Sequence, residues 1–148
     1  MDADIAALRE EYLNKDFDRT EFEIDPVRFV DFAKACGETE SRYIDPDDPD
    51  FQALPTFPCS LMGGRSRPQG FPTFGGIGMD GGKAVEPLKP IRPGVKLVGK
   101  THLHDIYTKT GRSGRMIFLV SRMEIYDADG EHLSNADTRI VIREKTQD

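Results

Sequence analysis

The sequence predicts an α+β fold, with helices in the first half of the chain and a meander of long antiparallel strands in the last third. The clearest helical pattern, residues 25–37, comes early. Three segments with strand character come late, at about 95–108, 115–126 and 131–143, and the short turns TGRSG and DADG separate them. Because short connections join antiparallel neighbours, these segments predict adjacent strands of one sheet. A length of 148 residues favours a single domain, residues 1–148.

The N-terminal region predicts one helix and one short strand. In residues 3–13, the side chains of Ile5, Leu8 and Tyr12 fall on one side of a helix, and the acidic residues near its start suit a helix N-terminus. Residues 20–24 (TEFEI) alternate as a short strand does.

Residues 25–37 (DPVRFVDFAKACG) carry the start and stop signals of a helix. Asp25 suits the N-cap, Pro26 suits the first helical position, and Gly37 is placed to end the helix. Four residues at helical spacing predict one apolar stripe: Phe29, Phe32, Ala33 and Cys36.

The middle of the chain predicts loops around one short helix. Residues 38–52 are a polar loop rich in Asp and Pro, and residues 65–82 are a loop rich in Gly and Pro. Between them, PTFPCSLMGG (55–64) predicts a short buried helix that Thr56 caps and Gly63 and Gly64 end. Residues 83–94 hold three prolines, so only their start is expected to pair, at a sheet edge.

Composition narrows the class of protein. A net charge of −6 argues against general nucleic-acid binding, which needs many phosphate-neutralising Lys and Arg side chains. Two cysteines make no disulfide framework and favour a reducing compartment. The N-terminus lacks the basic and apolar regions of a signal peptide, and the longest apolar run, IFLV, is too short to cross a membrane. We therefore expect a soluble cytoplasmic protein that binds neither nucleic acid nor a membrane.

Charge is unevenly distributed along the chain. Residues 1–51 hold 16 acidic and 6 basic side chains, whereas residues 83–122 hold 2 acidic and 9 basic side chains. Such a basic stretch suits a small phosphorylated ligand or an acidic partner, and it suits the solvated face of a sheet equally well.

The glycine cluster GGIGMDGG, residues 75–82, contains the dinucleotide-binding pattern GxGxxG and is followed by Lys83. That pattern needs a strand before it and a helix after it, because the helix N-terminus holds the pyrophosphate. The three following prolines exclude a helix. The Walker pattern also fails, since Ala84 stands where Ser or Thr should follow the lysine. We interpret the cluster as a flexible loop that leads into a strand.

Three other groups carry weaker chemical signals. His102 and His104 share one face of a predicted strand and suit the start of a metal site, but without a clear further ligand, ordinary strand histidines are favoured. Cys59 is either a low-pKa thiol near a helix N-terminus or, more in keeping with cysteine, a buried packing residue. The acidic residues of the 38–50 loop lack the order of a calcium-binding loop and predict a solvated loop. We therefore expect no metal.

An ordered set of segments covers most of the chain: VRFVDFAKACGE (27–38), YIDP (43–46), LPTFP (54–58), MDGGKAVEPLKPIRPG (79–94) and TGRSGRMIFLVSRMEIYDADGE (110–131). Together they resemble the MaoC-like hydratase/dehydratase family, in particular its N-terminal-domain branch. The resemblance implies a hot-dog fold, in which a long antiparallel sheet wraps around a central helix, here PTFPCSLMG. It also implies dimers or double hot dogs that act on acyl thioesters of coenzyme A or acyl carrier protein.

The catalytic signature of that family is altered in this chain. Its Asp and His, five positions apart, activate water for addition to an enoyl thioester, a reaction that needs a general acid and base and an oxyanion hole. Here Glu38 stands at the Asp position and Tyr43 at the His position. A phenol, with an ordinary pKa of about 10, is a poor base at neutral pH. We therefore expect no catalytic residue in this chain.

The resemblance implies a role beside a catalytic partner. In this branch a dyad-less chain pairs with a second hot-dog chain that carries the Asp/His dyad, and it shapes the acyl pocket of a heteromeric (R)-type enoyl-CoA hydratase or 3-hydroxyacyl thioester dehydratase. Alone, it is expected to be inactive. The coenzyme A thioester is then the substrate, and no cofactor is expected. The glycine-rich residues 63–82, in place of a packed helix, leave room for a bulky or polycyclic acyl chain, as in lipid or steroid metabolism.

The expected site residues fall into two groups. The substrate-binding candidates are Thr56, Phe57, Cys59, Met62, Asp80, Gly81 and Gly82. The candidates for binding the coenzyme A phosphates are Lys83, Lys109, Arg112 and Arg115.

Three alternatives stay open. A hot-dog thioesterase takes a carboxylate from the central helix or a facing strand, but TFPCSLMGG has none and Asp80 is the one carboxylate near the expected pocket. A non-enzymatic partner that binds thioesters or is purely structural would lack the dyad just as a hydratase subunit does, so the sequence does not separate the two. Glu38 or Asp80 with Tyr43 would make an unusual active site, whose geometry and pKa values would both have to be rebuilt.

Overall fold

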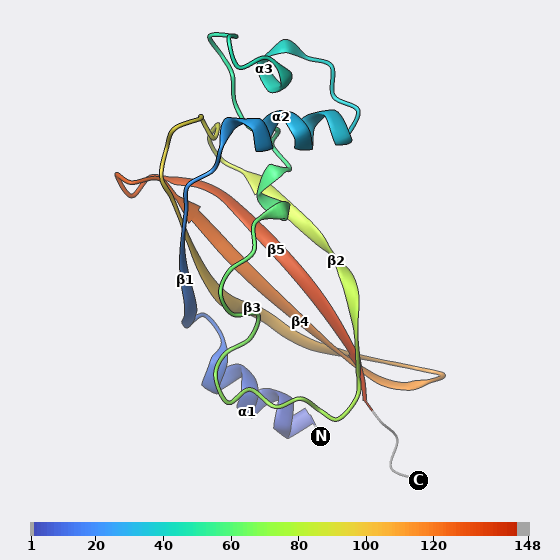
Figure 1. Ribbon diagram of the computed structural model, residues 1–148. Coiled ribbons are helices and arrows are strands. Elements are labelled where there is room, and N and C mark those ends of the chain that lie inside the picture. Colours follow the sequence, from blue (N-terminus) through green and yellow to red (C-terminus); the bar gives the residue numbers. More distant parts are fainter. Residues whose placement is uncertain (1, 145–148) are drawn as a thin grey trace.

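The computed structural model describes residues 2–144 and is built on a five-stranded antiparallel sheet (Figure 1). The strands are β1 (Asp16–Phe22), β2 (Ile77–Pro87), β3 (Leu97–Gly111), β4 (Gly114–Tyr126) and β5 (His132–Arg143). Their order across the sheet is β1-β3-β4-β5-β2, and every pairing is antiparallel. The predicted α+β class and the meander of three late strands are confirmed.

The helices lie on one face of this sheet, which we call the inner face (Figure 1). α2 (Pro26–Ala35) and α3 (Ser41–Ile44) lie at one end of the sheet, and α1 (Asp2–Tyr12) lies at the other. The 3-10 helix η1 (Phe57–Ser60) lies over the inner face between them. Residues 61–76, which we call the crossing segment, run over the same face from η1 toward α1 and then enter β2.

The predicted helix after Asp25 is confirmed, with one correction at its end. Asp25 is the N-cap, and its Oδ1 accepts the backbone N–H of Val27 at 2.9 Å. Phe29 and Ala33 are buried, as the apolar stripe predicts. Cys36, the last member of that stripe, is instead the exposed C-cap residue, because α2 ends at Ala35.

The predicted buried helix over residues 55–64 is much shorter than expected. Only Phe57–Ser60 form helix, and Leu61 is already extended, with ψ of 134°. The side chain of Thr56 makes no capping hydrogen bond, so the predicted cap is wrong. Gly63 and Gly64 follow soon after the end of η1, and glycine disfavours a helix because of its conformational freedom, so little favours a longer helix here. The sheet therefore wraps around a four-residue helix and the crossing segment.

Three further boundaries differ from the sequence-based ones. β1 begins at Asp16, four residues before the predicted strand. The polar loop of residues 38–52 contains the one-turn helix α3, which is too short to show periodicity. β2 begins at Ile77, inside the predicted 65–82 loop, and continues to Pro87, which an edge strand tolerates because proline lacks only a donor.

Two hydrophobic clusters fill the inner face. The first joins α2 and η1 to the sheet, and its largest fully buried side chains include Phe29, Phe57, Leu97 and Ile125. The second joins α1 to the other end of the sheet through Ile5, Leu103, Ile106, Ile117 and Ile142. Within residues 2–144, no helix is long and apolar enough to span a membrane.

Candidate functional site

The Glu38 side chain is engaged with its own loop. Gly37, at φ +79°, ends α2, and Glu38 follows it directly. Glu38 Oε1 accepts the backbone N–H groups of Thr39 and Glu40, both at 2.9 Å. Short polar contacts of this kind shape turns, so the carboxylate at the first dyad position has a local structural role.

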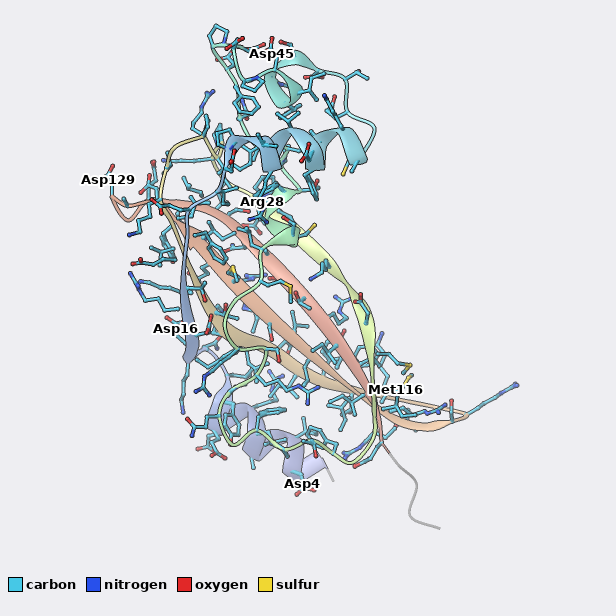
Figure 2. The ribbon with its side chains drawn as sticks, in the orientation of Figure 1. Asp4, Asp16, Arg28, Asp45, Met116 and Asp129 are labelled. Carbon is cyan, nitrogen blue, oxygen red and sulfur yellow. The ribbon has the colours of Figure 1, made fainter. Side chains whose placement is uncertain are left out.

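The second dyad position, Tyr43, lies within α3 and is 8% exposed. The guanidinium carbon of Arg42 lies 4.9 Å from the centroid of its ring, a cation–π arrangement. Figure 2 shows Asp45, two residues further, at the end of the molecule beyond α2. Neither Glu38 nor Tyr43 lines the inner-face cavity described next.

A cavity of about 170 Å³ lies on the inner face, where Leu61 and Met123 of the first cluster approach Ile140 beside the second. We call it the inner cavity. η1 and the crossing segment line one wall, and β2 to β5 line the other. The wall on the sheet side is unusually polar for a core, since it includes Thr101, Ser121, Thr138 and Lys83.

The predicted substrate-binding residues around η1 separate into two groups. Cys59 and Met62 line the inner cavity, and Met62 is 83% exposed. Phe57 is 1% exposed and packs edge-on against Phe29, with ring centroids 4.9 Å apart. Thr56 is exposed and lines no part of the inner cavity.

Phe57 is held in the core from more than one side. Phe32 packs edge-on against its ring, with centroids 5.4 Å apart. Arg28 of α2 lies beside η1 (Figure 2), and its guanidinium carbon is 5.9 Å from the centroid of the Phe57 ring. These contacts give Phe57 a packing role.

The glycine cluster forms part of β2 and not the expected flexible loop. A bulge lies between Asp80 and Lys83, and Gly82 has φ +104°, a conformation that favours glycine. Asp80 Oδ1 accepts the Gly82 N–H at 2.8 Å. No helix follows, so the cluster lacks the context of a nucleotide loop, as the sequence indicates.

The predicted Asp80, Gly81 and Gly82 lie beside the inner cavity but do not line it. Asp80 lines an adjoining groove of about 340 Å³ together with Arg67, Lys83 and Arg139. Gly81 and Gly82 line a smaller recess nearby.

The four predicted phosphate-binding cations do not form one group. Lys83 Nζ donates a hydrogen bond to Thr138 Oγ1 at 3.2 Å. Thr138, on β5, lies opposite Ser121 on β4. Arg115 lies six residues from Ser121 along β4, so its backbone is about 20 Å further along the sheet than Ser121. Lys109 and Arg112 lie in the same β3–β4 hairpin as Arg115.

Contacts within the hairpin account for two of these three cations. Lys109 Nζ lies 5.3 Å from the centroid of the Phe118 ring, which stacks on Tyr107. Arg115 binds Glu144 through two hydrogen bonds of 2.8 Å, and this contact lowers the pKa of the Glu144 carboxyl. Only Lys83 of the four lines the inner cavity.

Thr101 is a residue of the inner cavity that sequence reasoning missed. Its side chain is on the inner face of β3 and the residue is 6% exposed. Among residues 2–144, its Oγ1 is the one buried side-chain polar atom without a hydrogen-bond partner. A buried hydroxyl in this state costs free energy, so it marks a place where a bound group would add a hydrogen bond.

The histidine pair lies on the outer face, opposite the inner cavity. His102 Nε2 lies 3.2 Å from His104 Nδ1, which confirms that the two rings share a face. Burial lowers the pKa of His102, and the Glu124 carboxylate opposes this shift. His132 is elsewhere, stacked on Tyr126. Within residues 2–144, no three His, Cys, Asp or Glu side chains are grouped to hold a metal ion.

The acidic 38–50 loop uses its carboxylates in its own turns. Asp45 Oδ1 accepts the Asp47 N–H at 2.9 Å, and Asp48 Oδ1 accepts the Asp50 N–H at 2.8 Å. The hydroxyl of Ser41 donates to the other Asp48 oxygen at 2.5 Å, a contact that lowers the pKa of Asp48.

Comparison with known proteins identifies the family. A model described as FAS1-like, dehydratase domain region matches residues 13–136, and the chain belongs to this family. Solved structures agree: the chain is similar to the MaoC-like dehydratase from Phytophthora capsici, with a TM-score of 0.69 and 22% identity over 94% of this chain and 50% of that one. The chain thus spans half the length of that protein. The chain is a MaoC-like protein with the hot-dog fold, as the resemblance predicted.

Two further solved structures are complexes. The chain is similar to the ChsH1-ChsH2 complex from Mycobacterium tuberculosis, with a TM-score of 0.67 and 16% identity over 99% of this chain and 93% of that one. It is also similar to the truncated HadBC (3R-hydroxyacyl-ACP dehydratase) complex from the same organism, with a TM-score of 0.61 and 16% identity over 87% of this chain and 99% of that one. At these identities the likeness concerns the fold. No curated protein sequence matches the chain.

Proposed function

We propose that this chain is the dyad-less subunit of a heteromeric (R)-type enoyl-CoA hydratase or 3-hydroxyacyl thioester dehydratase. The observation that carries the proposal is the state of the two dyad positions. Glu38 accepts two backbone N–H groups of its own loop, and Tyr43 is buried beneath Arg42. Neither residue is placed to activate a water molecule in the inner cavity, so a partner chain supplies the Asp and His.

The free edge of β2 is the place where we propose that the partner joins. Within residues 2–144, β5 is the one strand that pairs with β2, which is 11 residues long. Two apolar side chains on it are exposed, Ile77 by 64% and Met79 by 43%. Such an edge offers unpaired N–H and C=O groups to another strand. The ChsH1-ChsH2 and HadBC complexes support a partner with the same fold.

The inner cavity is the proposed acyl pocket of this subunit. It lies against β2, and Leu61, Met123 and Ala136 give it an apolar side. The substrate in this proposal is a coenzyme A thioester, which needs no separate cofactor. We also propose a cytoplasmic location, because an exposed free thiol, here that of Cys36, persists best in a reducing compartment.

Purification of the tagged chain from its native cells tests this proposal. We expect a second hot-dog chain with Asp and His five positions apart to co-purify, and we expect hydration of a trans-2-enoyl-CoA only when both chains are present. Full hydration activity of the lone chain would overturn the proposal. A stable complex without hydration activity would instead favour a structural or thioester-binding partner. Release of free coenzyme A by the lone chain would favour a thioesterase.

A further inference from the structure

Three cations meet where the inner cavity joins the adjoining groove. Arg65 and Lys83 line the inner cavity, and Arg67 and Lys83 line the groove. Lys83 therefore belongs to both spaces, and we call the junction the basic mouth. Within residues 2–144, none of these three side chains forms a salt bridge. Unpaired arginines that face a cavity attract anions.

The carboxylates that line the inner cavity and the groove do not neutralise the basic mouth. Asp137 lines the inner cavity, but it binds Arg122 through two hydrogen bonds of 2.8 and 3.0 Å. Asp80 lines the groove and accepts the Gly82 N–H, and Arg139 lines the groove as a further cation. The groups that face the mouth thus leave an excess of positive charge, in a chain whose net charge is −6.

The backbone of β2 makes room for one of these cations. A guanidinium nitrogen of Arg67 lies 3.9 Å from the point that a Cβ at Gly78 would occupy. Gly78 pairs with the buried Ile142, so this contact is on the inner face, where Lys83 also lies opposite Thr138. The crossing segment and β2 therefore present cations to the same space from two sides.

We propose that Arg65, Arg67 and Lys83 bind the phosphate groups of coenzyme A. This inference rests on the proposed function and gives the thioester a direction: phosphates at the basic mouth, acyl group toward Leu61 and Met123. Guanidinium groups suit this role because their planar fork of donors matches two phosphate oxygens at once. The grouping differs from the sequence-based one, which combined Lys83 with three cations of the β3–β4 hairpin.

Calorimetric binding of three probes to the protein as purified with its partner tests the proposal: coenzyme A, dephospho-coenzyme A and pantetheine. The Arg65→Glu/Arg67→Glu variant is expected to bind coenzyme A at least 10-fold more weakly than wild type and pantetheine equally well. The matched control is Arg92→Glu, which reverses an exposed charge in the loop between β2 and β3 and is expected to change coenzyme A affinity less than twofold. Dephospho-coenzyme A shows which phosphate is bound.

Unchanged coenzyme A affinity in the double variant, or a larger loss in Arg92→Glu, would overturn the proposal. Loss of pantetheine binding as well would mean that the cavity is damaged, and the Arg65→Lys/Arg67→Lys variant then decides. Wild-type-like coenzyme A affinity in this lysine variant supports the phosphate site. Weak coenzyme A affinity in the lysine variant overturns the proposal. Failure of the proposed function is seen separately, because hydration by the wild-type complex would then be absent whatever the affinities are.

Discussion

The backbone N–H of Gly64 donates a hydrogen bond to Asp18 Oδ2 at 3.1 Å and ties the crossing segment to the edge strand β1. The same N–H lies 3.1 Å from Thr20 Oγ1, and that hydroxyl donates to Asp18 Oδ2 at 2.7 Å. The neighbouring Gly63 lies so close that a Cβ there would be 2.6 Å from the same oxygen. This contact positions the wall of the inner cavity to which Cys59 and Met62 belong.

Loss of the Asp18 carboxylate is expected to release the crossing segment. Asp18→Ala removes the acceptor for Gly64 and Thr20 and should lower the free energy of unfolding by about 1–2 kcal/mol. Urea denaturation followed by circular dichroism measures the change. Glu10→Ala, at an exposed position of α1, is the control and should stay within about 0.5 kcal/mol of wild type. Equal changes in unfolding free energy for the two substitutions would show that the Asp18 carboxylate does not stabilise the crossing segment.

Two threonines of the inner face should respond in opposite ways to the same substitution. Thr101→Val removes a buried hydroxyl without a partner and should raise the free energy of unfolding by about 1 kcal/mol, or the melting temperature by about 2–4 °C. Thr20→Val breaks two hydrogen bonds and should lower the free energy by about 1 kcal/mol. Thermal denaturation compares them. Destabilisation by Thr101→Val would mean that its hydroxyl is already satisfied.

Phe57 and Met62 were both predicted to bind substrate, but their contacts predict different effects. Phe57→Ala empties a site in the first hydrophobic cluster and should cost about 3–5 kcal/mol of folding free energy. Met62→Ala removes an exposed side chain of the inner cavity and should change stability by less than about 0.5 kcal/mol. Chemical denaturation separates the two. If Phe57→Ala were as stable as Met62→Ala, the packing role of Phe57 would be wrong.

His102 should make the fold less stable as the pH falls below 7. Burial lowers its pKa in the folded state, the Glu124 and Asp16 carboxylates oppose the shift, and His104 and Arg122 add to it. The unfolded chain, with an ordinary histidine pKa of about 6.5, therefore takes up the proton first. Stability is lost as the pH falls through that value and levels off below the folded pKa.

Urea denaturation at pH 7, 6 and 5 measures this effect, with His102→Gln as the comparison. The variant should lose less stability than wild type over this range. The carboxyls of Glu21, Asp48 and Glu144 have lowered pKa values, so their contribution is lost only at more acidic pH. Parallel curves for the two proteins would show that His102 does not cause the loss between pH 7 and 5.

Patterns that depend on side-chain periodicity predicted the fold well. β3, β4 and β5 alternate between the two faces, and Asp25 and Gly37 mark the ends of α2 as sequence indicated. β2 was partly missed because its glycines carry no side chain and so show no alternation. The predicted strand omits the first residues of β1, because acidic residues such as Asp16 and Asp18 are not typical of a buried strand. Asp18 nevertheless lies on the inner face, opposite Thr101.

The residues around the inner cavity were predicted less completely, since their positions depend on strand register and on a loop. Cys59, Met62 and Lys83 do line the inner cavity. The sequence did not place Arg65 at the inner cavity or Arg67 at the adjoining groove, because both belong to a segment without regular structure, whose path no periodicity reveals. Membership of the basic stretch 83–122 grouped Lys109 and Arg115 with Lys83, whereas strand pairing separates them along the sheet. Residues two apart in a strand face the same side of the sheet. Thr101 therefore shares the inner face with the core residue Leu103, and the sequence pattern of β3 could have indicated this.

The hydration rate of a trans-2-enoyl-CoA by the complex with its partner chain tests whether catalysis resides outside this chain. The comparison is between wild type and the Glu38→Gln/Tyr43→Phe variant, which keeps an oxygen acceptor at Glu38 and the buried ring at Tyr43. We expect kcat/KM to differ by less than twofold, since neither residue contributes an acid or a base. A loss of about 100-fold or more, the size expected for removal of a general acid or base, would contradict a dyad-less role for this chain.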